Sequence, residues 1–331
     1  MSSYEISQPP KDGISNIRFS PDDSKLLVSS WDSVVRVYDV QNNCIRSQYS
    51  HALPALDCAW IDSNQCISGS LDKSLKRFDI TTGTDESLLG HTEAVRCVEY
   101  SSEINASITG SWDKTFKIWD FRAENKSQSS TNLPGKVYSM AKQGNKLVIA
   151  TSERHVDIYD NRNFSVPEQR RESVLKYQTR CIRCSPDGSG YASGSIEGRV
   201  AIEYFDPAPE VQKLKYAFKC HRTTREQPGK GKIDVVHPVN VIEFHPTYGT
   251  FATGGGDGRV NIWDGKNKKR ICQFPVFPTS ISSLSFDSTG SRIAIAVSYT
   301  FEEGEKDHAP DTIWIRSIED AEVRPKPRAS S

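Results

Sequence analysis

"GSWDKTFKIWD" (residues 110–120) joins a polar turn to an alternating apolar run that ends in Trp-Asp. Related endings recur along the chain, and the first four are spaced 40 or 41 residues apart. They are "RVYD" at Asp39, "KRFD" at Asp79, "KIWD" at Asp120, "DIYD" at Asp160, a divergent "VAIEYFD" at Asp206, "NIWD" at Asp264 and "TIWIRSI" at 312–318. The 331 residues therefore contain seven related units.

Each unit also opens with an alternating apolar run, such as "VRCVEYS" (95–101), and has a turn before its final run. Period-two alternation broken by Gly, Asp, Asn and Ser turns predicts short antiparallel strands. A period near 40 with a terminal Trp-Asp is typical of WD-repeat propeller blades, and Gly90-His91 completes that pattern in the third unit. We therefore predict an all-β, seven-bladed WD-repeat β-propeller, with residues 1–318 as one domain and 319–331 as a flexible C-terminal tail.

The seventh unit offers three strands, near 280–286, 291–298 and 312–318. The N-terminal "YEISQ" (4–8) precedes the innermost strand of the first blade. We expect it to supply the outermost strand of the last blade and so to close the ring, which removes exposed sheet edges.

Composition argues against several classes of function. Lys plus Arg equals Asp plus Glu at 42 each, so no diffuse attraction to nucleic acid is expected. No apolar run approaches the roughly 18 residues of a membrane span, and we expect no membrane partner. Cys181 and Cys184 form a lone CxxC, but residues three apart on a strand face opposite ways and cannot share a metal. We expect no metal, no cofactor, no catalytic residues and no enzymatic activity.

Several conspicuous polar residues have structural interpretations. Buried polar groups need partners, so the histidines before strands should join networks within blades. The residues concerned are His91 with Trp119, His51 with Phe78, and the turn aspartates Asp72, Asp113 and Asp257.

The blade geometry also converts the sequence into a surface map. If strands a to d run from the centre outward, the b–c turns and the d–a connections share one face, here called the top face. Trp31 and Trp112 precede the turn aspartates of blades one and three. Each Trp is either exposed as a partner anchor or packed sideways on the next blade.

Blade five concentrates cations on this face. Arg180 begins its strand a, Arg199 begins its strand c, and Lys219, His221 and Arg222 end its strand d. Adjacent strands lie about 4.8 Å apart, so these side chains should converge into a patch suited to a phosphorylated side chain. The alternative is a set of scattered, solvated charges.

Other charged stretches have simpler interpretations. We expect 223–237 to be a mobile connection, 123–132 a polar loop and 301–310 an acidic insertion in blade seven. Arg170 and Arg171 should lie on the outermost strand of blade four and protect its edge from pairing with other chains.

Longer motifs resemble one family over nearly the whole chain. They are "LLVSSWDSVVRVYDV" (26–40), "TGSWDKTFKIWD" (109–120), "RRESVLKYQTRCIR" (170–183), "SIEGRVAIEYFDPAPEVQKLKYAFKCHR" (195–222) and "FATGGGDGRVNIWD" (251–264). The sequence resembles the budding-uninhibited-by-benzimidazole propellers of the spindle assembly checkpoint. A related family, the mRNA-export propellers of the nuclear pore, shares the fold and much of blade five.

The resemblance implies a non-enzymatic adaptor found in the nucleus and at kinetochores in mitosis, with some cytoplasmic pool. Its implied partners are a short motif of a checkpoint kinase and its pseudokinase-like relative, phosphorylated Met-Glu-Leu-Thr repeats of a kinetochore scaffold, and the mitotic checkpoint complex. By position, the resemblance assigns Trp31, Trp112 and Arg180 to the kinase-partner motif. It assigns Arg199, Lys219 and Arg222 to the phosphothreonine.

Two alternatives remain open at this point. One is an mRNA-export role with a nucleoporin segment as partner. The other is a hydrolase or lyase on a propeller frame, against which no convergent acid, base and nucleophile set is found.

Overall fold

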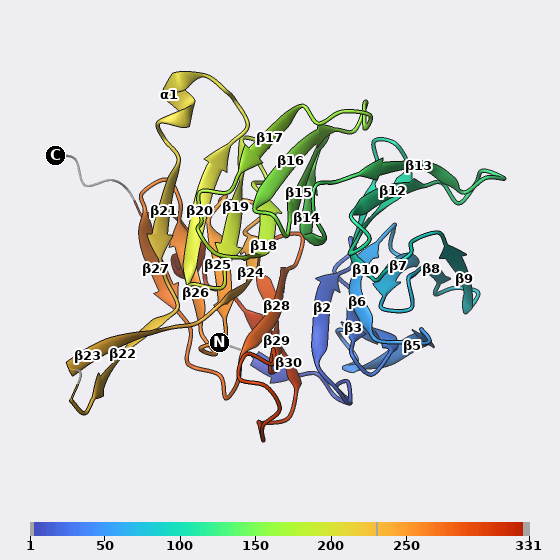
Figure 1. The fold of residues 1–331 in the computed structure, drawn as a ribbon. Coiled ribbons are helices and arrows are strands. Elements are labelled where there is room, and N and C mark those ends of the chain that lie inside the picture. The colour runs from blue at the N-terminus through green and yellow to red at the C-terminus, as the bar shows by residue number, and fades with distance from the viewer. Residues whose placement is uncertain (1–2, 230, 327–331) are drawn as a thin grey trace.

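The computed structural model describes residues 3–229 and 231–326. Within them, seven four-stranded antiparallel sheets follow one another around the molecule in chain order (Figure 1). The first strand of each blade contacts the first strand of the next, and β28 contacts β2, which closes the ring. The predicted seven-bladed propeller is confirmed.

The strands of each blade run in order from the centre to the rim. Blade one consists of β2 (Ile14–Phe19), β3 (Lys25–Ser30), β4 (Val34–Asp39) and β5 (Cys44–Ser50). Blade two consists of β6 (Ala55–Trp60), β7 (Gln65–Ser70), β8 (Ser74–Asp79) and β9 (Thr84–Leu89). Blade three consists of β10 (Val95–Ser101), β11 (Ala106–Ser111), β12 (Thr115–Trp119) and β13 (Ser127–Asn132). Blade four consists of β14 (Val137–Gln143), β15 (Lys146–Thr151), β16 (His155–Asp160) and β17 (Gln169–Glu172).

Blade five consists of β18 (Thr179–Cys184), β19 (Gly190–Ser195), β20 (Arg199–Tyr204) and β21 (Tyr216–Lys219). Blade six consists of β24 (Val239–Phe244), β25 (Phe251–Gly255), β26 (Val260–Asp264) and β27 (Lys269–Gln273). Blade seven consists of β28 (Ile281–Phe286), β29 (Arg292–Val297), β30 (Thr312–Ser317) and β1 (Ser3–Glu5).

The core lies between neighbouring blades. Second strands such as β3, β11 and β19 are buried along their whole length. Close packing needs small residues at the contacts: a Cβ on Gly110 would lie 2.7 Å from Cγ1 of Val137 in the next blade. Each blade is thus held by its neighbours and not by a core of its own.

The N-terminal strand closes the ring, as predicted. β1 pairs with β30, with Tyr4 opposite Ile315. The Tyr4 hydroxyl donates to the carbonyl oxygen of Val40 in blade one at 2.7 Å, and Ile6 is buried. The N-terminus therefore joins blade seven to blade one.

Three segments differ in form from the expectations. The prediction of a polar loop over 123–132 is wrong, because its second half is the outer strand β13; an outermost strand can be wholly polar since it faces solvent. Residues 223–237 contain the hairpin of β22 (Arg222–Gln227) and β23 (Gly231–Val236), which projects from the body (Figure 1). Beyond Ile318, where a tail is expected, α2 (Asp320–Val323) buries Val323 beneath blade six.

A short helix, α1 (Pro209–Gln212), lies within the c–d connection of blade five.

A recurrent irregularity positions the central side chains. Each innermost strand has a register shift near its start, for example between Val95 and Cys97 and between Thr179 and Cys181. A bulge re-aims the extra side chain away from the ladder. The extra residues Arg96 and Arg180 line the central channel.

None of the described helices is long and apolar enough to cross a membrane.

Candidate partner-binding surface on the top face

The top face is defined by a hydrogen bond that recurs in all seven blades. The residue after strand b donates its backbone N–H to the carbonyl oxygen of the residue before strand a. Examples are Trp31 to Gly13 at 2.8 Å, Trp112 to Ala94 at 3.0 Å and Ile196 to Gln178 at 3.1 Å. The b–c turns and the d–a connections therefore lie side by side, as predicted.

The turn aspartates and histidines form buried networks. In blade three, His91 Nδ1 lies 2.8 Å from Asp113, His91 Nε2 lies 2.7 Å from Thr109 Oγ1, and the Trp119 indole N–H donates to that oxygen at 2.7 Å. In blade two, His51 contacts Asp72 at 3.1 Å, and Phe78 stacks on Tyr49. These residues support the turns from inside, as expected.

His221 belongs to the same class, which corrects its prediction as a rim cation. Its side chain is fully buried, and its Nδ1 lies 2.7 Å from Asp257. Its Nε2 lies 2.8 Å from Thr253 Oγ1, to which Trp263 also donates. The "GGGDG…NIWD" unit reproduces the network of blade three, so His221 does not contribute to a surface patch.

The two tryptophans differ in exposure. Trp31 is 46% exposed on the top face, with Cδ1 against Gly13. Trp112 is mostly packed, and its buried indole N–H has no acceptor among the described residues. Trp31 therefore presents more aromatic surface to solvent than Trp112 does, and exposed aromatic surface of this kind is available to be buried by a partner.

Two exposed apolar residues were missed by sequence reasoning. Val174 and Tyr177 are 46% and 56% exposed in the connection between blades four and five, beside Ile196 at 39%. The stretch "SVLKYQ" (173–178) could have indicated them, because apolar residues are unusual in a surface connection.

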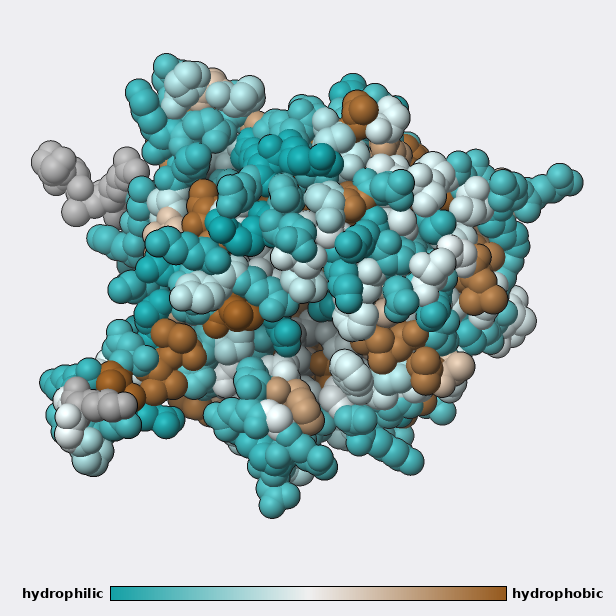
Figure 2. All heavy atoms as spheres, viewed as in Figure 1, coloured by the Kyte–Doolittle hydropathy of each residue, from teal (hydrophilic) through white to brown (hydrophobic). Residues whose placement is uncertain are grey.

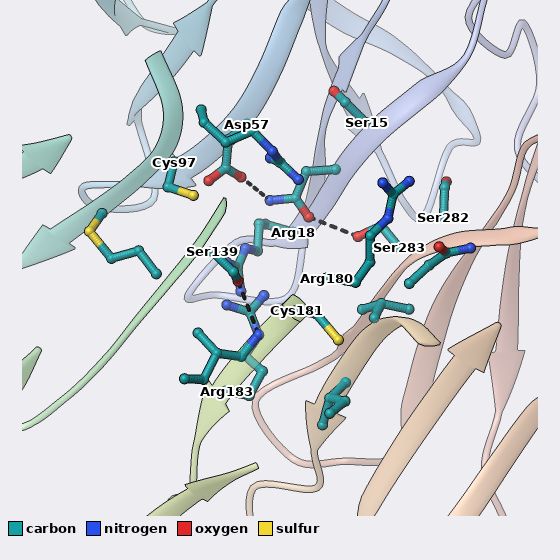
Figure 3. A pocket seen from close by; sticks show the side chains of 17 residues that line it. Ser15, Arg18, Asp57, Cys97, Ser139, Arg180, Cys181, Arg183, Ser282 and Ser283 are labelled. Atoms are coloured by element: carbon teal, nitrogen blue, oxygen red, sulfur yellow. Dashed lines mark hydrogen bonds between the residues drawn. The ribbon is translucent and has the colours of Figure 1, made fainter. Parts of the chain in front are cut away.

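Arg180 projects into the mouth of the channel beside Ser282 and Ser283 (Figure 3). Burial, and then the nearby guanidinium of Arg96, lower the pKa of Arg180. Among the described residues no hydrogen bond or ion pair is found for the Arg180 side chain, although the negative charge of Glu302 acts on it. A desolvated cation that no carboxylate contacts directly favours an anionic ligand.

The charges deeper in the channel are already paired. Arg183 donates Nε–H to Glu243 at 2.8 Å and lies 3.4 Å from Glu99, which also accepts from Arg18 at 3.4 Å. Although burial opposes it, the carboxylates of Glu243 and Glu99 raise the pKa of Arg183. This network links the inner strands of blades one, three, five and six. Arg180, at the mouth of the channel, is not part of it.

The predicted cations of blade five gather at its outer strands. Arg199 lies directly opposite Lys219 in the β20–β21 ladder. Lys219 is exposed, and the Arg199 side chain is 36% exposed with Nε 3.5 Å from Glu197. Arg222 donates to the carbonyl oxygen of Glu197 at 3.0 Å. The three cations therefore share one rim, while Arg180 lies two strands inward.

Arg170 and Arg171 lie on β17, the outermost strand of blade four, and both are engaged. Arg170 forms two hydrogen bonds of 2.8 Å to the buried carboxylate of Asp157. Arg171 reaches toward blade five, where it donates to the carbonyl oxygen of Phe205 at 3.3 Å. They serve the packing of blades more than a binding surface.

The CxxC cysteines are separated as expected. Cys181 packs toward blade six and Cys184 toward blade four. Burial raises the pKa of each thiol to about 12, so both are protonated at neutral pH. No group of metal-ligating side chains is found among the described residues.

Known proteins match this chain at the levels of repeat, fold and whole sequence. The model of the WD domain, G-beta repeat, matches residues 3–39, 84–120 and 232–264. The solved WD40 repeats of RRP9 superpose with a TM-score of 0.79, covering 96% of this chain and 97% of that one at 18% identity, which shows the fold.

Two curated relatives bear on function. The mitotic checkpoint protein BUB3.1 of Arabidopsis thaliana is 54% identical over 98% of this chain and 95% of its own length. The poly(A)+ RNA export protein of Schizosaccharomyces pombe is 38% identical over 98% of this chain and 93% of its own. The chain belongs to the Bub3 family of WD-repeat mitotic checkpoint proteins.

Proposed function

We propose that this protein is a checkpoint adaptor that holds two ligands at once. Its top face binds a short motif of a checkpoint kinase and of its pseudokinase-like relative. The rim of blade five binds phosphorylated Met-Glu-Leu-Thr repeats of a kinetochore scaffold. The observation that carries the proposal is the division of these cations into two sets, Arg180 at the channel mouth and the Arg199–Lys219 pair at the rim.

The rim suits a phosphothreonine. A phosphate carries about −1.5 to −2 charge and three acceptor oxygens, and Arg199 and Lys219 offer donors from adjacent strands. Arg222 is anchored by Glu197, so its guanidinium is oriented toward the same rim. Glu197 partly neutralises the patch, which disfavours weak anions relative to a dianionic phosphate.

The top face suits a peptide that orders on binding. Such a segment loses conformational entropy, so a few buried anchors must offset that loss. Trp31 supplies an exposed aromatic surface and Arg180 a buried cation for an acidic side chain. Trp112 adds a second aromatic side chain at the equivalent turn of blade three.

In this proposal the adaptor brings the kinases to unattached kinetochores and delays anaphase. It works in the nucleus and at kinetochores in mitosis, with some cytoplasmic pool, and enters the mitotic checkpoint complex. The test is co-purification of a tagged copy from mitotically arrested cells. Recovery of a checkpoint kinase and a phosphorylated scaffold supports the proposal, and recovery of neither overturns it.

The similarity to an RNA export protein favours a second candidate, in which the top face binds a nucleoporin segment. The formal net charge of zero argues against direct RNA binding as its basis. The same purification separates the two functions, because a nucleoporin recovered without checkpoint kinases supports export.

A further inference from the structure

A groove on the top face lies between blades six and seven, and neither Trp31 nor the rim residues Arg199 and Lys219 line it. Its walls are the turn 256–258, the connection 276–280 and the blade-seven loop that begins at Tyr299. The Phe277 N–H donates to the carbonyl oxygen of Gly258 at 2.9 Å. A Cβ at Gly258 would lie 2.5 Å from the Phe277 oxygen, so these two walls meet backbone to backbone. Such contacts make the groove pre-formed.

The groove has apolar and aromatic walls. Val276 is 56% exposed beside the partly buried ring of Phe277, and Tyr299 forms the opposite side. Figure 2 shows apolar surface along the projecting β22–β23 hairpin. Its strand β23 carries Ile233 and Val236, which are 36% and 43% exposed, and Val236 lies at the hairpin base opposite Arg222. Exposed apolar surface beside a groove is typical of a protein-binding site.

The polar side of the groove is acidic. Glu302 accepts hydrogen bonds from Ser280 Oγ at 3.2 and 3.3 Å, which fixes one carboxylate in the groove. Glu303 supplies a second, and the carboxylate of Asp257 is committed to His221. Among the described residues that line the groove, Lys306 is the one ammonium or guanidinium, and His237 adds an imidazole. His237 and Arg225 also act on Glu303 by their charge, so the carboxylates that an incoming cation can meet are Glu302 and Glu303, beside the ring of Tyr299.

Lys306 shows which group suits this surface. Its Nζ lies 4.9 Å from the centroid of the Tyr299 ring and 2.5 Å from Glu303. A cation over an aromatic face and beside a carboxylate is doubly stabilised. The pair is exposed, at 42% for Lys306 and 71% for Glu303, so it holds Lys306 only weakly. An incoming cation can replace it.

We propose that the groove between blades six and seven binds a basic side chain, an arginine or lysine, of a protein segment that crosses the top face. The cation lies over Tyr299 between Glu302 and Glu303, and it displaces Lys306. Apolar neighbours of the basic residue pack on Val276 and Phe277. The identity of the segment rests on the proposed function, but the chemistry of the groove does not.

The first experiment uses acetyl-Gly-Arg-Gly-amide as the probe, with the citrulline peptide as its neutral isostere. The isotope-labelled full chain is titrated and amide shifts are followed by NMR. The arginine peptide should shift Gly256, Gly258 and Thr300, and the citrulline peptide should not. Equal shifts with both peptides would show that charge is not recognised and would overturn the proposal.

The second experiment changes the groove and repeats the titration. The E302Q/E303Q double variant should weaken arginine binding about two- to fivefold, whereas K306A should strengthen it by a similar factor, because a competitor is removed. D307N removes an acid of the same loop that does not line the groove, and binding should not change. Weakening by K306A, or an equal loss in D307N, would contradict the proposal.

These outcomes separate the groove from the proposed function. Capture of a checkpoint kinase can fail while the arginine peptide still binds, which would leave the groove without the proposed segment. A groove that fails to bind the arginine peptide leaves the roles of Arg180 and Arg199 unaffected.

Discussion

Arg199 and Lys219 face each other directly across the ladder of β20 and β21, so two cations from different strands lie on one rim. Like charges placed opposite each other are destabilising unless an anion comes between them. Glu197, 3.5 Å from the Nε of Arg199, offsets part of this repulsion, and the phosphate of the proposed ligand would offset more.

We predict that Arg199→Ala removes most of the preference for phosphorylated over unmodified scaffold peptide. Charge-assisted hydrogen bonds contribute about 1.5–3 kcal/mol each, so phosphopeptide affinity should fall about 10- to 100-fold. Isothermal titration calorimetry with both peptides measures the effect. Lys269→Ala, an exposed cation on the outer strand of blade six, is the matched control and should bind normally. Undiminished discrimination in Arg199→Ala would disprove the assignment.

Arg180→Ala should weaken the kinase-partner motif and leave phosphopeptide binding intact, because the two sites lie two strands apart. Trp31→Ala should also weaken the motif, by about 2 kcal/mol, as expected for a hot-spot aromatic residue. Both variants should fold, since Arg180 forms no ion pair with another described residue and Trp31 is 46% exposed. Leu214→Ala, at a position 56% exposed in the c–d connection, is the control for loss of exposed apolar surface. A pull-down equal to wild type in both variants would count against the top-face site.

Deletion of residues 1–9 should lower Tm by several degrees, because β1 is the outer strand of blade seven and carries the buried Ile6. Ile6→Ala should reproduce part of the loss, at about 2–4 kcal/mol. Glu5→Ala changes an exposed residue of the same strand and should have little effect. Differential scanning calorimetry measures all three, and an unchanged melt after the deletion would contradict closure by this strand.

Arg183→Leu should destabilise the fold by about 3–5 kcal/mol, because it leaves the carboxylates of Glu99 and Glu243 without their shared guanidinium. The comparison is Arg162→Leu, which breaks an ion pair with Asp160 in which the Arg162 side chain is 76% exposed. An exposed pair contributes about 0–1 kcal/mol. Urea unfolding should separate the two variants clearly, and equal losses would argue against a bracing role for the channel network.

Stability should fall on acidification below neutral pH. Burial lowers the pKa of His91, despite its hydrogen bond to Asp113. The unfolded chain therefore takes up the proton first as the pH falls below about 6.5, and the stability present above that pH is lost toward the lower folded pKa. Urea midpoints at pH 7.5 and 5.5 should show this decline. His91→Gln should be less stable but should have a shallower pH dependence, whereas replacement of the exposed His308 by Gln should leave the slope unchanged.

Sequence alone determined the blades, their number and the closing strand, because the seven units repeat one local pattern of alternating apolar runs and a turn, and six of them end in an aromatic residue followed by Asp. It also placed Arg199 and Lys219 together, since neighbouring strands of one blade pair in a simple register. The tertiary structure decided which cations form ion pairs within the protein and which do not. Arg183 and Glu99 are 84 residues apart in the chain and meet only across the closed channel. Arg180 lies at the bulge of β18, and no ion pair joins its side chain to another residue in the part of the chain that the structure describes.

Sequence reasoning missed the burial of His221, because the hairpin of β22 and β23 separates it along the chain from blade six, which supplies its partners Asp257 and Thr253. The groove between blades six and seven is likewise built from three segments that only the closed ring brings together. Local patterning specifies blades, while contacts between blades decide which charges are paired with each other and which remain for a partner.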